Sequence, residues 1–167
     1  MSEDLSIIQG TKEEQYQALL PQLKALIDGE PDLIANLANI CAALKEQFGW
    51  LWIGFYLVKP CVTTQDDELV LGPFQGPVAC TRIRKGRGVC GSAWQLAHTL
   101  IVPDVEKFPG HIACSSLSKS EIVIPIIRNN EVIAVLDADS EVYGLFDETD
   151  KKYLEEIVAE INFIPVP

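Results

Sequence analysis

The sequence lacks three features that would place it in large functional classes. It has no apolar run near the roughly 20 residues that a membrane-spanning helix needs. It has no excess of basic residues: 13 Lys and Arg face 24 Asp and Glu, for a net charge of −11. Phosphate and anionic lipid are bound by clustered Lys and Arg, so this balance argues against both as partners. The first residues, Met1 to Asp4, lack the basic and then apolar pattern of a signal peptide. We therefore expect a cytoplasmic protein without nucleic-acid or membrane partners.

The sequence also lacks any two neighbouring cysteines with the spacing of a metal or redox motif. Of its five cysteines, Cys80 and Cys90 are 10 residues apart (90 − 80), and Cys90 and Cys114 are 24 apart (114 − 90). A zinc site built from these three thiols and a histidine is therefore a weak interpretation, and we predict no metal and no other cofactor. Any joint chemistry of the three cysteines must be assembled by the fold.

The apolar patterns predict one α+β domain over residues 1–167. An N-terminal helical segment lies within 1–30, where Thr11 and Glu14 form a capping box and Pro21 predicts a kink or two shorter helices. A second helix is expected over 32–48, and a C-terminal helix over 147–164. Between them lie about six strands, expected over 50–58, 69–74, 78–83, 99–102, 121–128 and 131–139. Their short connections predict an antiparallel sheet with helices packed mainly on one face.

Three acidic residues are expected to gather at one end of this sheet. Asp137 and Asp139 are two residues apart on a strand and so share a face, and Glu121 begins the neighbouring strand. A strict register around the Asn129-Asn130 turn pairs Glu121 with Ala138, which points it to the opposite face. A bulge or a one-residue slip would bring all three together. They form either a solvated acidic rim or a partly buried cluster in which at least one pKa is raised; we favour the cluster.

Aromatic and cysteine residues give further candidates. Trp52 and Tyr56 flank Gly54 on one face of a predicted strand, as core residues or as the wall of a ligand site, and the pattern alone favours the core. Cys114 lies in an aperiodic segment, 104–120, of the kind that usually carries function. Cys90 stands at a predicted helix start, and three basic residues precede it (Arg84, Lys85 and Arg87). Both features favour a thiolate, whereas Cys80, on a predicted strand, could be a buried hydrophobe.

Several of these segments together resemble one family. They are Val78-Ala79-Cys80, Gly88-Val89-Cys90-Gly91, Phe108-Pro109-Gly110-His111-Ile112-Ala113-Cys114, Ser120-Glu121-Ile122-Val123 and the aromatic run Trp52-Ile53-Gly54-Phe55-Tyr56. They resemble the free methionine-(R)-sulfoxide reductases, which are single GAF-domain enzymes, over nearly the whole chain. Generic GAF domains lack this set of cysteines. The resemblance implies a GAF-like fold and turns the interpretation of Trp52 and Tyr56 toward a ligand site.

The resemblance also implies a mechanism. Glu121, Asp137 and Asp139 would bind the ammonium group of free methionine R-sulfoxide, and one of them, protonated, would donate to the sulfoxide oxygen. Trp52 and Tyr56 would pack against the methyl end. Cys114 would attack sulfur and become a sulfenic acid, which a second thiol would convert to a disulfide.

The remaining roles implied by the resemblance concern the other thiols and the partners. Cys80 is the first choice as the resolving cysteine, with Cys90 as a second partner or relay. Thioredoxin would be the reductant, and a homodimer is favoured. Cys90 as the attacking thiol stays open, because of its helix start and basic loop. Two other functions also stay open: a non-catalytic GAF sensor of a small molecule, and a thiol-based redox sensor.

Overall fold

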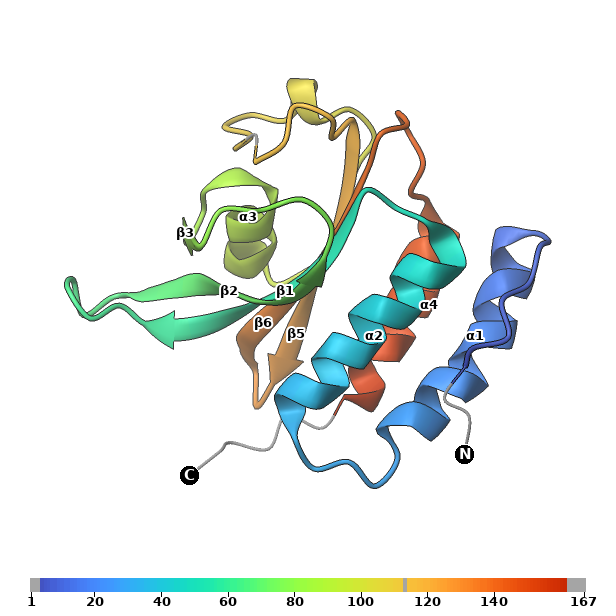
Figure 1. Cartoon of the computed structure of the whole chain (residues 1–167). Coiled ribbons are helices and arrows are strands. Elements are labelled where there is room, and N and C mark those ends of the chain that lie inside the picture. The colour runs from blue at the N-terminus through green and yellow to red at the C-terminus, as the bar shows by residue number, and fades with distance from the viewer. Residues whose placement is uncertain (1–3, 113, 162–167) are drawn as a thin grey trace.

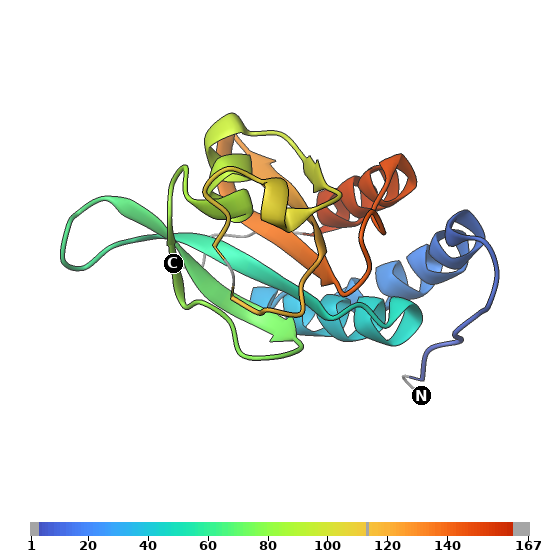
Figure 2. The same ribbon diagram turned by 90° about the horizontal axis from the view of Figure 1, so that it is seen from above.

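The computed structural model describes residues 4–112 and 114–161. Within them, six strands form one antiparallel sheet in the order β3-β2-β1-β6-β5-β4. The strands are β1 (Trp52–Pro60), β2 (Asp67–Gln75), β3 (Arg82–Arg84), β4 (Leu100–Val102), β5 (Ser120–Arg128) and β6 (Glu131–Ser140). Figures 1 and 2 show helices on both sides of this sheet, with most of them on one side. The predicted α+β class is confirmed.

Three helices cover one face of the sheet. They are α1 (Lys12–Ile27), α2 (Leu33–Phe48) and α4 (Glu148–Glu160). α2 packs on β1 and β2, α4 packs on β5, and α1 lies outside them against α2 and α4 (Figure 1). Alternate side chains of the central strands, such as Ile53, Ile124 and Leu136, complete this apolar core. None of the helices in the described ranges is both long and apolar enough to cross a bilayer.

The helix ends follow the expected chemistry. The capping box of α1 is confirmed: Thr11 Oγ1 accepts from the N–H of Glu14 at 3.2 Å, and Glu14 Oε2 accepts from the N–H of Thr11 at 2.8 Å. α1 continues through Pro21 as one helix, so the alternative of two shorter helices is wrong. α4 begins after its cap Asp147 and ends at Glu160, and residues 162–164 of the predicted helix lie outside the described residues.

The opposite face of the sheet carries α3 (Gly88–Leu96) and the long connections. α3 packs on β3, β5 and β6, and a short 3-10 helix, η1 (Val105–Lys107), lies in the segment after β4. This face has its own core, in which Tyr56, Val89, Cys90 and Val123 are buried. An apolar core and the segments with the candidate functional residues therefore lie on the same face of the sheet.

The strand predicted over 78–83 is wrong in its first half. Only Arg82–Arg84 forms a strand, while residues 78–80 run as a loop. The carbonyls at both ends of this stretch are held by side chains of β1. Trp52 Nε1–H donates to Pro77 O at 3.0 Å, and the Tyr56 hydroxyl donates to Cys80 O at 2.9 Å. These bonds occupy carbonyls that a strand would use for its ladder, and they hold Cys80 beside the sheet.

Candidate active site

A β-bulge decides which way the acidic residues point. The turn Asn129-Asn130 has positive φ at both residues (51° and 64°), as a two-residue hairpin needs. From there the pairing runs Arg128 with Glu131 and Ile127 with Val132, and then shifts so that Ile126 lies opposite Ala134. The extra residue in β6 moves the later register by one place. Glu121 therefore lies opposite Asp139, and not opposite Ala138.

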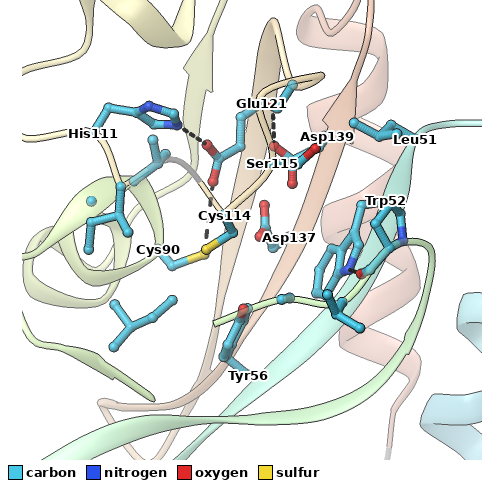
Figure 3. Close-up of a pocket in the computed structure, with 18 of the residues that line it drawn as sticks. Leu51, Trp52, Tyr56, Cys90, His111, Cys114, Ser115, Glu121, Asp137 and Asp139 are labelled. Carbon is cyan, nitrogen blue, oxygen red and sulfur yellow. Dashed lines mark hydrogen bonds and ion pairs between the residues drawn. The ribbon is translucent and has the colours of Figure 1, made fainter. Parts of the chain in front are cut away.

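The shift brings the three acids to one face, as the predicted one-residue slip requires. Glu121 faces Asp139 across the strands, and Asp137 lies opposite Val123, two residues along from Glu121. The neighbouring strand β1 adds Trp52 opposite Asp139 and Gly54 opposite Asp137. The acids and the aromatic pair therefore project from adjacent strands into the same space, where Figure 3 shows the three carboxylates converging.

These side chains line a pocket between the sheet, α3 and two loops. The space within this lining is about 610 Å³, a figure that includes the open mouth of the pocket. Its lining comprises residues of β1, β5 and β6, of the loops around 77–79 and 111–118, and of the first turn of α3. Every candidate site residue from the sequence contributes to this lining except Cys80, whose neighbour Ala79 does and whose thiol is bonded to Cys114, a lining residue.

The aromatic wall depends on a missing side chain. The rings of Trp52 and Tyr56 stack with centroids 5.9 Å apart, and Phe74 also stacks with Trp52, at 5.4 Å. A Cβ at Gly54 would lie 2.3 Å from Trp52 Cη2 and 2.5 Å from Phe74 Cβ. Only glycine fits there, because the Trp52 ring and Phe74 themselves occupy the space beside Gly54, which is therefore not open to a ligand.

The carboxylates are buried and repel one another. Glu121 and Asp137 are each 6% exposed. Burial is the largest cause that raises the pKa of both well above the ordinary range, and the charge of Asp139 adds to the shift. Burial also raises the pKa of Asp139 to about 6, against a 2.5 Å hydrogen bond donated by Ser118 Oγ, which lowers it. Near neutral pH the cluster therefore holds both a protonated carboxyl and a negative charge.

The three cysteines have two different environments. Cys80 and Cys114 form a disulfide, with their Cα atoms 5.9 Å apart, and Cys114 is exposed at the pocket. Cys90 is 4% exposed and its thiol donates to Glu121 Oε1 at 3.9 Å. Burial raises the pKa of the Cys90 thiol, and Asp137 and Glu121 raise it further. The helix start and the basic loop therefore do not lower the pKa of the Cys90 thiol, which weakens the alternative that Cys90 attacks.

Two side chains at the acids were not among the predicted site residues. His111 Nε2 lies 3.8 Å from Glu121 Oε2, and burial lowers the pKa of the imidazole, so it is mostly neutral near pH 7. Ser118 is buried and its hydroxyl binds Asp139. Ser118 gives no sequence signal, since serine is common in loops. The Pro-Gly-His motif could have pointed to His111.

The cysteines and acids of the pocket are also possible metal ligands. The zinc set of Cys80, Cys90, Cys114 and a histidine is not assembled, because Cys80 and Cys114 are bonded to each other. A different set is close together: one ligand atom each from Cys90, Glu121 and Asp137, all within 4.8 Å of one another.

Comparisons with known proteins agree on the fold. The family model described as "GAF domain" matches residues 30–164. GAF domain-containing protein A of Dictyostelium discoideum is 65% identical over 162 residues, covering 97% of this chain and 99% of the relative. Both findings place the chain among GAF domains along most of its length.

Two further relatives carry a name that states an activity. The free methionine-R-sulfoxide reductase of Escherichia coli is 46% identical over 90% of this chain and 88% of its own length. The X-ray structure of the free methionine-R-sulfoxide reductase from Neisseria meningitidis in complex with its substrate superposes with a TM-score of 0.91 at 52% identity, covering 96% of this chain and 93% of that one. The likeness therefore includes the segments that line the pocket.

Proposed function

We propose that this chain, which belongs to the GAF domain family and within it to the free methionine-R-sulfoxide reductases, reduces free methionine R-sulfoxide to methionine. One observation of the structure carries the proposal: a disulfide between Cys80 and Cys114 lies at a pocket that also holds three buried acids. A pair of thiols that can be oxidised and a proton donor beside them are the two things that sulfoxide reduction requires.

The buried acids suit a free amino acid. A methionine within a peptide has no ammonium group on the residue itself, whereas free methionine sulfoxide carries one. A buried cluster of carboxylates has a high cost unless a cation is bound, because Glu121 and Asp137 are shielded from water. An ammonium group offers three N–H donors and a positive charge, which satisfy those oxygens. We therefore assign Glu121, Asp137 and Asp139 to the ammonium group.

The aromatic wall suits the other end of the substrate. Trp52 and Tyr56 offer apolar ring faces beside the acids, and the methyl-sulfur end of the substrate is its apolar part. Binding between these two regions would place the sulfoxide group in the middle of the pocket. Oxygen leaves sulfur only once it is protonated, so a neighbouring carboxyl with a raised pKa can act as the general acid. Glu121, whose pKa burial and two neighbouring charges raise, is our choice.

The redox steps balance with two thiols. The Cys114 thiolate attacks the sulfoxide sulfur, the oxygen takes a proton from the general acid, and methionine leaves while the oxygen ends on Cys114 as a sulfenic acid. The Cys80 thiol then displaces that oxygen as water, and the Cys80–Cys114 disulfide forms. In total, two thiols and one sulfoxide give one disulfide, one methionine and one water. A dithiol returns the disulfide to two thiols.

Tyr56 supports the choice of Cys80 as resolving cysteine. Its hydroxyl binds the carbonyl of Cys80 and so holds this residue at the side of the pocket. Cys90 is held against Glu121, with a raised thiol pKa, and stays the second partner or relay. Thioredoxin as the physiological dithiol, a homodimer, a cytoplasmic location and a single domain over 1–167 remain parts of the proposal that rest on the sequence.

Methionine release tests the proposal. The protein would be given free methionine R-sulfoxide, the S epimer or a peptide-bound sulfoxide, with dithiothreitol as reductant. We expect turnover of the free R form alone. Cys114→Ser should abolish it, while Cys61→Ser, a control at a free cysteine outside the pocket lining, should not. Without reductant, Cys80→Ser should still release methionine once per active site. No turnover of any sulfoxide would leave the two sensor functions, and oxidation by peroxide alone would favour the redox sensor.

A further inference from the structure

One group of side chains at the floor of the pocket is more than an ammonium site needs. The Cys90 thiol lies 3.9 Å from Glu121 Oε1, one of the carboxylate oxygens that we assign to the ammonium group of the substrate. One ligand atom from each of Cys90, Glu121 and Asp137 lies within 4.8 Å of the others, and all three residues are buried. A thiol contributes little to binding an ammonium group, but it is a strong ligand for soft metal ions.

A second observation is independent of that clustering. Asp137 Oδ1 is the one buried side-chain oxygen or nitrogen among the described residues that has no hydrogen-bond partner, although the side chain is 94% shielded from solvent (6% exposed). A buried polar atom without a partner is unfavourable and is rare in folded proteins. Such an atom, beside a thiol and a second carboxylate, indicates a ligand that accepts electron pairs.

We propose that Cys90, Glu121 and Asp137 bind a thiophilic divalent cation such as Zn²⁺, and that the site persists while Cys80 and Cys114 are joined in their disulfide. Cys90 is a free thiol in that state, so the cation needs neither of the two bonded cysteines. The cation would take the oxygens of Glu121 and Asp137 that we assign to the ammonium group of the substrate, so the two ligands would compete. The proposal goes beyond the reductase function and would stand without it.

The geometry is close to what zinc requires. Zinc binds sulfur at about 2.3 Å and carboxylate oxygen at about 2.0–2.2 Å in a tetrahedron, so its ligand atoms lie roughly 3.4–3.7 Å apart. The distance of 3.9 Å between Cys90 Sγ and Glu121 Oε1 is near that range, and the 4.8 Å limit on the whole set requires a shift of about 1.4 Å at most (4.8 − 3.4). The pocket leaves the fourth position for water. Hard cations such as Mg²⁺ and Ca²⁺ prefer six or more oxygen ligands and fit this set less well.

Binding would release protons, because the ligands must be deprotonated. The thiol of Cys90 loses its proton to become a thiolate, and any proton held by Glu121 or Asp137 leaves as well. The doubly charged cation replaces those protons and relieves the repulsion between the carboxylates. Affinity should therefore rise with pH.

Cobalt(II), used as a spectroscopic stand-in for Zn²⁺, tests the site directly. The protein is prepared as the disulfide form without reductant and titrated with Co²⁺, in a Cys61→Ser background that removes a half-buried free thiol outside the pocket lining. We expect one equivalent to produce thiolate-to-cobalt charge-transfer absorption, which Zn²⁺ then removes by displacement. Cys90→Ser should eliminate this absorption. Glu121→Gln and Asp137→Asn should each weaken cobalt binding at least about tenfold.

Three results would overturn the proposal. They are the absence of thiolate absorption at one equivalent, absorption that survives in Cys90→Ser, and unchanged affinity in both carboxamide variants. Circular dichroism shows which variants fold, and the two carboxamide variants decide if Cys90→Ser does not. The titration contains no sulfoxide, so its failure would leave the proposed reductase activity untouched, and loss of that activity would not affect the titration.

Discussion

The hydrogen bond from Ser118 to Asp139 predicts a pH-dependent loss of substrate affinity in Ser118→Ala. Ser118 Oγ donates to Asp139 Oδ1 at 2.5 Å and lowers the pKa of that carboxyl, which burial has raised to about 6. A hydrogen bond to a charged group contributes about 1.5–3 kcal/mol. Because Asp139 is partly exposed, water would compensate for part of the lost hydrogen bond, and we use the low end of this range of energies. One pKa unit corresponds to about 1.4 kcal/mol, so the pKa of Asp139 would rise from about 6 to about 7.

The direction of the pH dependence follows from the sign of that change. A carboxyl group binds ammonium far more strongly when it is ionised, and raising its pKa reduces the ionised fraction at pH values near and below the new pKa. At pH 7 the ionised fraction of Asp139 would fall from roughly 90% to roughly 50%, and at pH 6 from roughly 50% to roughly 10%. KM for free methionine R-sulfoxide should therefore rise about twofold at pH 7 and about fivefold at pH 6. At pH 8.5 both proteins are ionised and the difference should disappear.

The assay is the ratio of KM values, variant over parent, measured from pH 6 to 8.5. Ionisation of the attacking thiol changes kcat in both proteins alike, so it cancels in that ratio. Ser116→Ala, at an exposed serine of the same loop, is the matched control, and Ser118→Thr should restore the parent profile because it keeps a hydroxyl. A KM ratio that is constant with pH would mean that Ser118 shapes the loop only. A ratio of one at pH 6 would refute the assignment of Asp139 to the ammonium group.

Three further predictions concern the wall, the acids and the Cys80 loop. Gly54→Ala should lower the free energy of unfolding by about 1–3 kcal/mol and raise KM, because its Cβ would overlap the six-membered part of the Trp52 ring. Adding Trp52→Phe should recover the stability, measured by urea unfolding. An unchanged stability of the single variant would contradict the packing argument. The melting temperature should fall as pH rises from about 4 through 6 and above, because Glu121, Asp137 and Asp139 bind protons more tightly in the folded than in the unfolded protein. Asp137→Asn should flatten this pH dependence. An unchanged slope would mean that the carboxylates are better solvated than their burial indicates. Tyr56→Phe removes the hydrogen bond to Cys80 O and should slow disulfide formation after the first methionine is released. Alkylation of quenched samples measures this rate. An unchanged rate would show that the hydrogen bond is not needed to hold Cys80 in place for the disulfide.

The sequence predicted the elements well and their exact register poorly. Caps and turns depend on a few neighbouring residues, so Thr11 with Glu14, and Asn129 with Asn130, could be placed from their identities alone. The bulge in β6 depends on how the whole hairpin fits the sheet. Pro125, which has no N–H for the ladder, makes an irregular ladder plausible, but it does not tell in which strand the extra residue lies. The bulge places Glu121 opposite Asp139 and not opposite Ala138. This shift of one residue decides that Glu121 points into the pocket with the other two acids.

The loop that carries Cys80 shows a second limit. Residues 78–83 have the composition of a strand, yet the carbonyls of Pro77 and Cys80 are taken by side chains of β1. The donors, Trp52 and Tyr56, are more than 20 residues away in the sequence, with separations of 25 and 24. Local propensity cannot anticipate such tertiary contacts. Ser118 was missed for the same reason, since its role exists only once Asp139 lies beside it.

The sheet divides stability and chemistry between its two faces. Along β5 and β6, the side chains of Ile122, Ile124 and Leu136 enter the apolar core under α2 and α4, while Glu121 and Asp137, which alternate with them, enter the pocket. The apolar face can therefore hold the strands in register while the other face keeps like charges together at a cost in free energy. Replacing a pocket acid by its amide removes part of that cost without touching the apolar core. We therefore expect such variants to lose activity and to be at least as stable as the parent at pH 8, which would separate a catalytic role of the acids from a structural one.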